Sequence, residues 1–204
     1  MTSPTVLPPS KAKANSRERL LAAATECFLN TGYIEASVEE IAKAAGVSRM
    51  TFYRHFTGKV DLSVALFQQA VNKAKPRFLQ ITELDFNNLA EIKRWLTAQF
   101  EIDKENRSLL RVFSQATAEG AGFTEKAQAT ISDYITALGE KIPAFRLQPD
   151  AKESRRRWLE AWLLIYEILD QSNHAALESG IATDPIVIDI LAEKFLTFIT
   201  TQPQ

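Results

Sequence analysis

Two short segments between residues 37 and 62 carry apolar side chains at helical spacing. In the first segment the apolar positions are Val38, Ile41, Ala42 and Ala45. This spacing of three and four residues predicts one buried face of a short helix. Ser37, with Glu40 three residues later, has the pattern of a capping box that starts the helix, and Gly46 is placed to end it.

The second segment, from about Arg49 to Phe56, separates apolar and polar positions more sharply. Phe52 and Phe56 share one face, and Ser48 precedes the segment as its expected cap. The opposite side displays Arg49, Thr51, Tyr53, Arg54 and His55. Two short helices joined by a tight glycine-containing turn predict a helix-turn-helix. Its second helix is expected to enter the major groove of DNA, which is about 12 Å wide.

These residues resemble the DNA-binding domain of the TetR family of transcriptional regulators. The residues that carry the resemblance are Ala45-Gly46-Val47-Ser48, Thr51-Phe52-Tyr53-Arg54-His55-Phe56, Lys59 and Leu62. The resemblance covers about residues 16 to 66. The chain departs from the family pattern at Met50, where many members carry a small residue, and at Val60, where an acidic residue is common.

The resemblance implies DNA contacts, and the chemistry of the side chains agrees with them. Arg49 can hold guanine O6 and N7 with two hydrogen bonds, and Thr51 can touch a thymine methyl group or a phosphate. Tyr53, His55 and Lys59 match positions that contact phosphate. The alternative for Lys59 and Arg54 is a solvated surface charge, and for His55 a place in the core. The expected DNA-binding residues are Ser37, Ser48, Arg49, Met50, Thr51, Tyr53, Arg54, His55 and Lys59.

Helical spacing continues through the rest of the chain and predicts an all-α protein. Ser16 is expected to cap a first helix from about Arg17 to Asn30. A long helix is expected from Lys59 to about Thr82, and Pro76 should kink it or end it slightly earlier. Five further helices are expected at about 88–106, 107–119, 124–142, 150–179 and 185–200. The predicted parts are an arm at 1–15, a helix-turn-helix domain at 16–60, and a helical effector-binding and dimerisation domain at 61–204.

The last two helices carry more apolar side chains than one buried face accommodates. In the final helix these are Ile186, Val187, Ile188, Ile190, Leu191, Phe195, Leu196, Phe198 and Ile199. The simplest cover is a second copy of the chain, so that four helices pack across a two-fold axis. The resemblance implies the same homodimer, whose two recognition helices would read a palindromic operator in double-stranded DNA. The expected interface residues are Trp158, Leu191, Phe195 and Phe198.

The resemblance also implies a small-molecule effector, because members of the family commonly release DNA when such a molecule binds. Candidates are aromatic and polar side chains of the second domain that are expected to face its interior. They are Trp95, Phe113, Gln115, Tyr134, Trp162, Tyr166 and Asn173. An aromatic lining favours a hydrophobic or planar compound. The alternative is that these side chains simply fill the core.

The distribution of charge supports a DNA-binding surface near the N-terminus. Through Gln80 there are 11 Lys and Arg against 6 Asp and Glu, a balance of +5, whereas the remainder has 13 against 19, a balance of −6. A basic first part on an acidic body suits phosphate binding. Residues 1–15 are rich in Pro, Ser and Lys and are expected to be disordered, with Lys11 and Lys13 either reaching DNA or remaining solvated.

Composition argues against the other broad classes of function. With two His, a single Cys27 on an apolar helix face and no glycine-rich phosphate loop, we expect no catalytic site and no cofactor. Asp170 and His174 have metal-ligand spacing, but no third ligand is evident, so a surface pair is expected and no metal site. The absence of a signal peptide and of a long apolar run predicts a cytoplasmic protein without a membrane span.

Three functions remain to be separated. The first is a ligand-responsive repressor. The second is an activator or repressor that answers to a protein partner or has no small-molecule effector, and only the response to an effector distinguishes it from the first. The third is an enzyme with a helical body, which has little support in the residues.

Overall fold

The computed structural model describes residues 15–201, apart from 120, 153 and the side chains at 119, 121 and 122. Most of the expected arm at 1–15, with Lys11 and Lys13, therefore lies outside the described residues. The α-helices are α1 (Ser16–Thr31), α2 (Val38–Ala44), α3 (Arg49–His55), α4 (Lys59–Phe78), α5 (Leu89–Glu105), α6 (Arg107–Glu119), α7 (Ala121–Gly139), α8 (Arg155–Ala176) and α9 (Ile186–Thr200). Short 3₁₀ helices lie at Leu79–Glu83, Pro143–Phe145 and Gly180–Thr183. The all-α prediction is confirmed.

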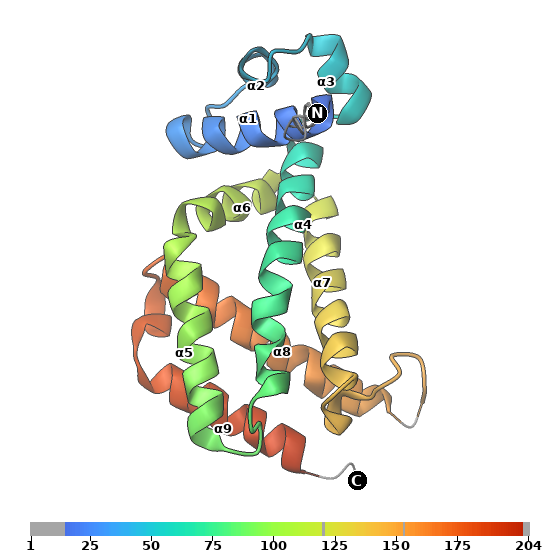
Figure 1. The fold of residues 1–204 in the computed structure, drawn as a ribbon, viewed down its shortest axis with the longest axis vertical. Helices are drawn as coiled ribbons and strands as arrows, with labels where there is room; N and C mark the ends of the chain where they lie inside the picture. Colours follow the sequence, from blue (N-terminus) through green and yellow to red (C-terminus); the bar gives the residue numbers. More distant parts are fainter. Residues whose placement is uncertain (1–14, 120, 153, 202–204) are drawn as a thin grey trace, which may run out of the picture.

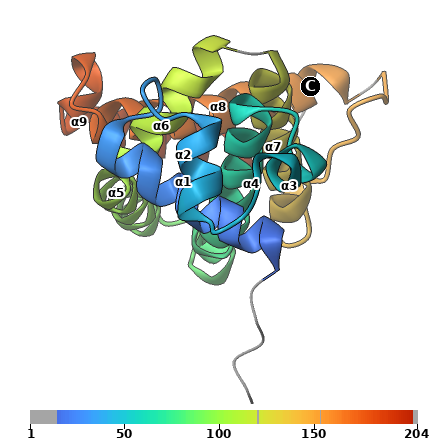
Figure 2. The same ribbon diagram turned by 90° about the horizontal axis from the view of Figure 1, so that it is seen from above.

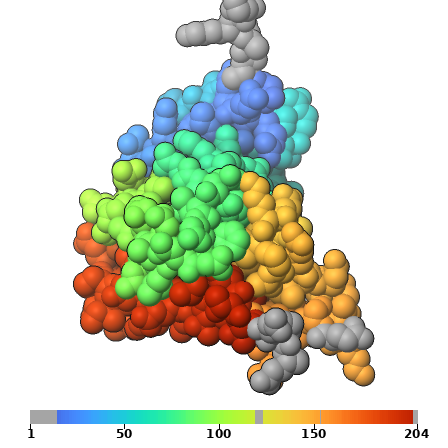
Figure 3. Space-filling view, turned by 60° about the horizontal axis from the view of Figure 1, so that its bottom comes forward, coloured from blue at the N-terminus to red at the C-terminus, as the bar shows by residue number. Residues whose placement is uncertain are grey.

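The helices are arranged as a small N-terminal unit mounted on a larger body. Helices α1, α2 and α3 form one end of the molecule, and α4 runs from that end down into the body beside α7 (Figure 1). The view onto this end shows α1, α2 and α3 lying over the body helices (Figure 2). At the opposite end, α9 lies along the outside of the body (Figure 3). None of the described helices is both long enough and apolar enough to cross a bilayer.

The first helices begin at side-chain caps. Ser37 Oγ accepts a hydrogen bond from the Glu40 amide (3.2 Å) while Glu40 accepts one from the Ser37 amide (2.9 Å), so the predicted capping box of α2 is confirmed. The cap of α1 is Asn15, not Ser16 as expected, because Asn15 Oδ1 accepts from the Glu18 amide at 2.9 Å. The Ser16 hydroxyl is used elsewhere, in a contact with His55.

Two helix boundaries differ from the prediction because tertiary contacts outweigh local signals. Helix α4 continues through Pro76 to Phe78 and passes into a 3₁₀ helix. Phe78 and Ile81 are both buried in the core of the body, and their burial stabilises this extension. Helix α8 begins at Arg155 rather than near Asp150. The Ser154 hydroxyl donates to the Gln148 carbonyl at 2.9 Å, which keeps the preceding segment folded back as a loop.

Helix α7 ends at Gly139, earlier than the expected residue 142. A Cβ at position 139 would stand only 2.5 Å from the Phe145 carbonyl oxygen, so this approach requires glycine. Arg146 Nε donates to the Gly139 carbonyl at 3.0 Å and closes the turn. The loop after α7 is thereby held against the end of its own helix.

The apolar residues form two clusters, and the first reaches beyond the predicted helix-turn-helix domain. It joins side chains of α1, α2, α3 and α4 to α6 and the start of α7. Phe67 of α4 makes ring contacts with Phe113 of α6 (5.4 Å between centroids) and with Phe123 of α7 (4.8 Å). The N-terminal unit therefore shares its core with the body.

The second cluster fills the body, where α5 packs against both α8 and α9. Leu191, Phe195 and Phe198 of α9 belong to this core and are 1%, 0% and 7% exposed. Leu191 and Phe195 therefore have almost no surface left for a partner, and the expectation that they form the dimer interface is wrong for this reason. For Phe198, and for Trp158, which is partly buried against the same cluster, the expectation stays a prediction. Because α9 is apolar on nearly every side, hydropathy alone did not distinguish the face that packs inward from the face left at the surface.

Replacing Phe195 with alanine tests the assignment of this residue to the core. Its ring contacts Trp95 (5.4 Å) and Phe145 (5.8 Å), so Phe195→Ala should lower the free energy of unfolding by about 3–5 kcal/mol. The measurement is urea denaturation at one fixed protein concentration. Ile181→Ala, at a position 80% exposed, is the control and should change stability by less than about 0.5 kcal/mol. Equal effects of the two substitutions would contradict the packing described here.

Candidate nucleic-acid interface

The recognition helix α3 is held in place by its apolar side. Phe52 is fully buried, and its ring contacts that of Phe56, which is 3% exposed, at a centroid distance of 5.8 Å. Gly46 adopts φ +63° in the turn between α2 and α3, where a side chain would be strained. Ser48 Oγ accepts from the Thr51 amide at 3.1 Å and caps α3. The predicted helix-turn-helix is therefore present, with its glycine at the expected turn.

Helix α3 lies at the outer end of the molecule (Figure 1), and its opposite side is exposed. Met50 is 81% exposed and Tyr53 is 44% exposed, while Arg49 and Arg54 are also exposed. Thr51 is half-buried, and its hydroxyl lies 3.0 Å from the hydroxyl of Ser48. The surface of α3 thus combines guanidinium groups, a phenol and a thioether, which can meet both phosphates and base edges.

Arg49 is held by two neighbours. Its NH1 group lies 2.8 Å from Glu39 Oε1 of α2, and its NH2 group donates to the Tyr53 hydroxyl at 3.4 Å. The guanidinium also stands 5.4 Å from the centroid of the Tyr53 ring. The hydrogen bond to Tyr53, and then the charge of Glu39, raise the pKa of Arg49, so the group is cationic at any pH at which DNA is bound.

His55 and Lys59 link α3 and α4 to the rest of the N-terminal unit. His55 Nε2 lies 2.7 Å from Ser16 Oγ at the start of α1. Lys59 Nζ donates to the carbonyl oxygens of Tyr33 (2.7 Å) and Ile34 (3.1 Å) and stands 4.4 Å from the Tyr33 ring centroid. Because an ammonium group has three N–H donors, one is left after these two bonds to reach a phosphate. Ser37, the remaining sequence candidate, is engaged in the capping box of α2.

The structure divides the candidate effector residues into two groups. Trp95, Phe113 and Tyr134 are buried, as expected; Trp95 Nε1 donates to the Phe78 carbonyl at 2.9 Å, and the Tyr134 ring stacks on that of Phe78. By contrast, Gln115, Tyr166 and Asn173 are exposed, and the expectation that they face the interior is wrong. Trp162 is half-buried and stacks on Tyr166 with the two rings nearly parallel, at 5.4 Å. The buried stripe of each helix excludes these outward positions.

A polar cluster inside the body was missed by the sequence analysis. Asp103 Oδ2 of α5 accepts hydrogen bonds from Ser172 Oγ of α8 (2.5 Å) and from Gln99 Nε2 (3.1 Å). Burial raises the pKa of Asp103. Burial, and then the charge of Asp103, raise the pKa of Tyr134 to about 12. The sequence feature that indicates this cluster is Gln99, a polar residue that follows Ile92 and Leu96 at helical spacing on the buried face of α5.

Asp170 and His174 form the surface pair that the sequence indicated. His174 Nδ1 lies 3.4 Å from Asp170 Oδ2, and both side chains are partly exposed. Among the described residues, no group of three or more His, Cys, Asp or Glu side chains is placed to hold a metal ion.

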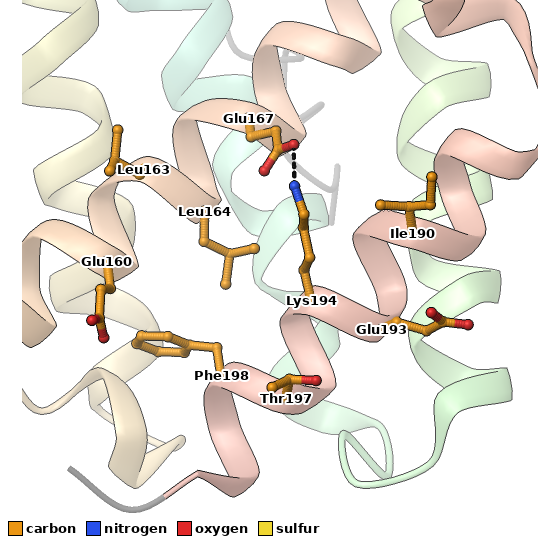
Figure 4. A pocket seen from close by; sticks show the side chains of 9 residues that line it. All are labelled: Glu160, Leu163, Leu164, Glu167, Ile190, Glu193, Lys194, Thr197 and Phe198. Carbon is orange, nitrogen blue, oxygen red and sulfur yellow. Dashed lines mark hydrogen bonds and ion pairs between the residues drawn. The ribbon is translucent and has the colours of Figure 1, made fainter. Parts of the chain in front are cut away.

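A groove runs between α8 and α9 on the outside of the body (Figure 4). Its lining residues are Glu160, Leu163, Leu164, Glu167, Ile190, Glu193, Lys194, Thr197 and Phe198. Lys194 of α9 and Glu167 of α8 form an ion pair across it at 2.5 Å. Leu163 and Ile190 are 59% and 46% exposed, so the groove has apolar walls in contact with water.

Known proteins share both the motif and the whole fold. The family model described as "Bacterial regulatory proteins, tetR family" matches residues 20–66. The HTH-type transcriptional repressor AcnR of Corynebacterium efficiens is 30% identical over 192 residues, which cover 87% of this chain and 90% of the relative. The HTH-type transcriptional activator FasR of Mycolicibacterium smegmatis is 28% identical over 157 residues, 70% of this chain and 72% of the relative.

A solved structure shares the fold. The crystal structure of Thermus thermophilus FadR, a transcriptional repressor in complex with lauroyl-CoA, superposes with a TM-score of 0.58 at 20% identity, covering 92% of this chain and 97% of that one. AcnR and FasR are both transcriptional regulators by name. The chain matches the family model at its helix-turn-helix, is 30% identical to a repressor over 90% of that protein's length, and shares the fold of a solved relative. The chain therefore belongs to the TetR family of DNA-binding transcriptional regulators.

Proposed function

We propose that this regulator is a homodimeric repressor that binds a palindromic operator through α3 and leaves it when a small-molecule effector binds in the body. The observation that carries the proposal is the two-sided character of α3, whose aromatic face is buried while Arg49, Met50 and Tyr53 face solvent. A helix with one braced side and one open polar side suits insertion into the major groove. Its target is chromosomal DNA, so we place its action in the cytoplasm.

The exposed apolar stripe of α8 and α9 supports a dimer. Its members are Leu159 (41% exposed), Leu163 (59%), Tyr166 (45%), Ile186 (59%) and Ile190 (46%). Exposed apolar side chains of this size on two neighbouring helices favour association, and a two-fold axis lets this surface cover its own copy, with the Lys194–Glu167 ion pair lying between the two helices. Two copies of α8 and α9 would then form a four-helix bundle with the recognition helices at the far end of each protomer. This stripe replaces Leu191 and Phe195 in the proposed interface, and Phe198 lies in the groove beside it.

The interior of the body offers both apolar and polar groups to an effector. Trp95 and Tyr134 supply aromatic surface, which favours a hydrophobic or planar molecule, whereas Phe113 belongs to the other cluster, which joins α4, α6 and α7. Asp103, with Gln99 and Ser172, supplies hydrogen-bonding groups beside Tyr134. Thermus thermophilus FadR, crystallised with lauroyl-CoA, is a protein of this fold that holds a ligand.

Packed side chains connect the body helices, where the effector would bind, to the helix-turn-helix. The aromatic contacts of Phe67, Phe113 and Phe123 join α4, α6 and α7, and the same cluster includes side chains of α1 and α3. A ligand that moves α6 or α7 must therefore shift α4 and the helix-turn-helix with it, because a packed core does not deform smoothly.

A second candidate is an activator, or a regulator that answers to a protein partner. The similarity to FasR, which is named as a transcriptional activator, favours the activator. The DNA-binding surface would be the same in both cases. The two are separated by transcription from the bound promoter, which falls with a repressor and rises with an activator, and by the response to small molecules.

Fluorescence anisotropy on the DNA upstream of the chain's own gene tests the central proposal. Random DNA of the same length is measured alongside at two salt concentrations, because phosphate contacts alone give salt-dependent binding without sequence preference. Saturable binding that exceeds binding to random DNA supports an operator at this place. Absence of DNA binding at both salt concentrations would contradict the proposal.

Replacing Arg49 separates base reading from phosphate binding. Arg49→Ala should weaken binding to the operator by about 1–3 kcal/mol and relax the preference at one base pair, because a guanidinium can pair with a guanine edge. Binding to random DNA should change much less. The measurement is anisotropy on the operator, on single-base variants and on random DNA. An equal loss on all three would assign Arg49 to the phosphate backbone.

Charges placed on the exposed stripe should disrupt the dimer without unfolding the chain. Leu163→Glu combined with Ile190→Glu puts like charges into the proposed two-fold interface, so sedimentation should report monomers while the helical circular dichroism is kept. Ile34→Glu, at a 63% exposed position in the N-terminal unit, is the control and should remain a dimer. An intact dimer of the double variant would place the interface elsewhere.

A further inference from the structure

A carboxylate stands on the surface that faces DNA, next to the recognition helix. Glu39 lies in the first turn of α2, its side chain is 55% exposed, and its Oε1 is 2.8 Å from Arg49 NH1 of α3. An acidic group at this place repels the phosphates of any DNA that α3 approaches. Glu39 therefore weakens DNA binding by its charge, and its presence on this surface calls for a compensating role.

Glu39 takes no part in the capping box, and its place in the first turn of α2 adds only a modest interaction with the helix dipole. The capping box of α2 uses Glu40, whose Oε2 accepts from the Ser37 amide and hydroxyl. The Glu39–Arg49 pair is itself exposed on both sides, 55% and 63%, and such pairs add little to stability. What the pair does change is the position of the Arg49 side chain.

The guanidinium of Arg49 is held between two helices. Glu39 of α2 takes one N–H of NH1, and the Tyr53 hydroxyl of α3 accepts one from NH2 at 3.4 Å while its ring lies beneath the group. A guanidinium carries five N–H donors in a fixed plane, so three remain for another partner. A free arginine at this position would sweep a wide arc and reach phosphate oxygens of any sequence. The held arginine presents its remaining donors in one direction.

We propose that Glu39 determines DNA sequence specificity by positioning Arg49 for a base edge and withholding it from the phosphates. The inference rests on the proposed reading of bases by Arg49. On the operator, the guanidinium of Arg49 forms hydrogen bonds with a guanine edge. These bonds offset the repulsion between the Glu39 carboxylate and the DNA phosphates. On random DNA, Arg49 has no matching base, and its ion pair with Glu39 withholds the guanidinium from the phosphates. Glu39 thus lowers the affinity for random DNA more than the affinity for the operator.

Removing the charge of Glu39 while keeping its shape should reverse this balance. Glu39→Gln should raise the affinity for random DNA about two- to fivefold, the size of one exposed charged contact, and steepen its salt dependence by about one unit. Affinity for the operator should change less, so the ratio of the two affinities falls. The preference at the base pair that Arg49 reads should become flatter.

The experiment starts by selecting a binding site from randomised duplex DNA with the unchanged protein. Anisotropy then measures dissociation constants for the selected site, its single-base variants and random DNA, using the unchanged chain, Glu39→Gln, Arg49→Ala and the double variant. With Arg49 absent, Glu39→Gln should no longer alter any base preference, because a positioning residue acts only through its partner. Glu35→Gln, which removes the same charge from an exposed position before α2, is the matched control and should leave base preference unchanged.

Two results would overturn the inference. The same gain on random DNA in the Arg49→Ala background would mean that Glu39 acts by its charge alone. A selected site whose bases are read equally well by Glu39→Gln and by the unchanged chain would also reject it while leaving the operator proposal intact. Selection of no preferred sequence by the unchanged protein would instead reject both the operator proposal and this one.

Discussion

The recognition helix spans only Arg49–His55, and a helix of this length is unstable in water without tertiary contacts. Burial of Phe52 against α1 and α2, with Phe56 beside it, supplies those contacts. The need to bury one side of α3 leaves the other side free for DNA. It also explains why α1, α2 and the start of α4 surround it with apolar side chains.

The same constraint joins the DNA-binding end to the body. Three short helices enclose a small core, and α4 and α6 complete it through Leu62, Leu66 and Phe113. The position of α3 consequently depends on helices whose other ends lie in the body. Because the helix-turn-helix unit and the body share a core, small shifts of the body helices can move α3 without a hinge between separate domains.

The N-terminal unit was predicted closely, and the surface of α8 and α9 was not. In α2 and α3, the capping residues Ser37 and Ser48, the glycine turn and the aromatic pair are local signals that agree with one another, and each appears in the structure. In α9 the apolar residues exceed one face, so local pattern did not separate Phe195, which is buried, from Ile190, which is 46% exposed. Neither the ion pair of Glu39 with Arg49 nor the bond of Asp103 to Ser172 leaves a trace in sequence spacing, because each joins different helices.

The sequence by itself determined the all-α class, the helix-turn-helix and the chemistry of its exposed face, because hydrophobic period, caps and turn residues are properties of neighbours along the chain. Only the tertiary structure decided which face of α9 is core, that Lys59 ties α4 to the turn after α1, and that Arg49 is held by an acid of another helix. These depend on distances between segments far apart or differently oriented, and those distances are set by how the helices pack.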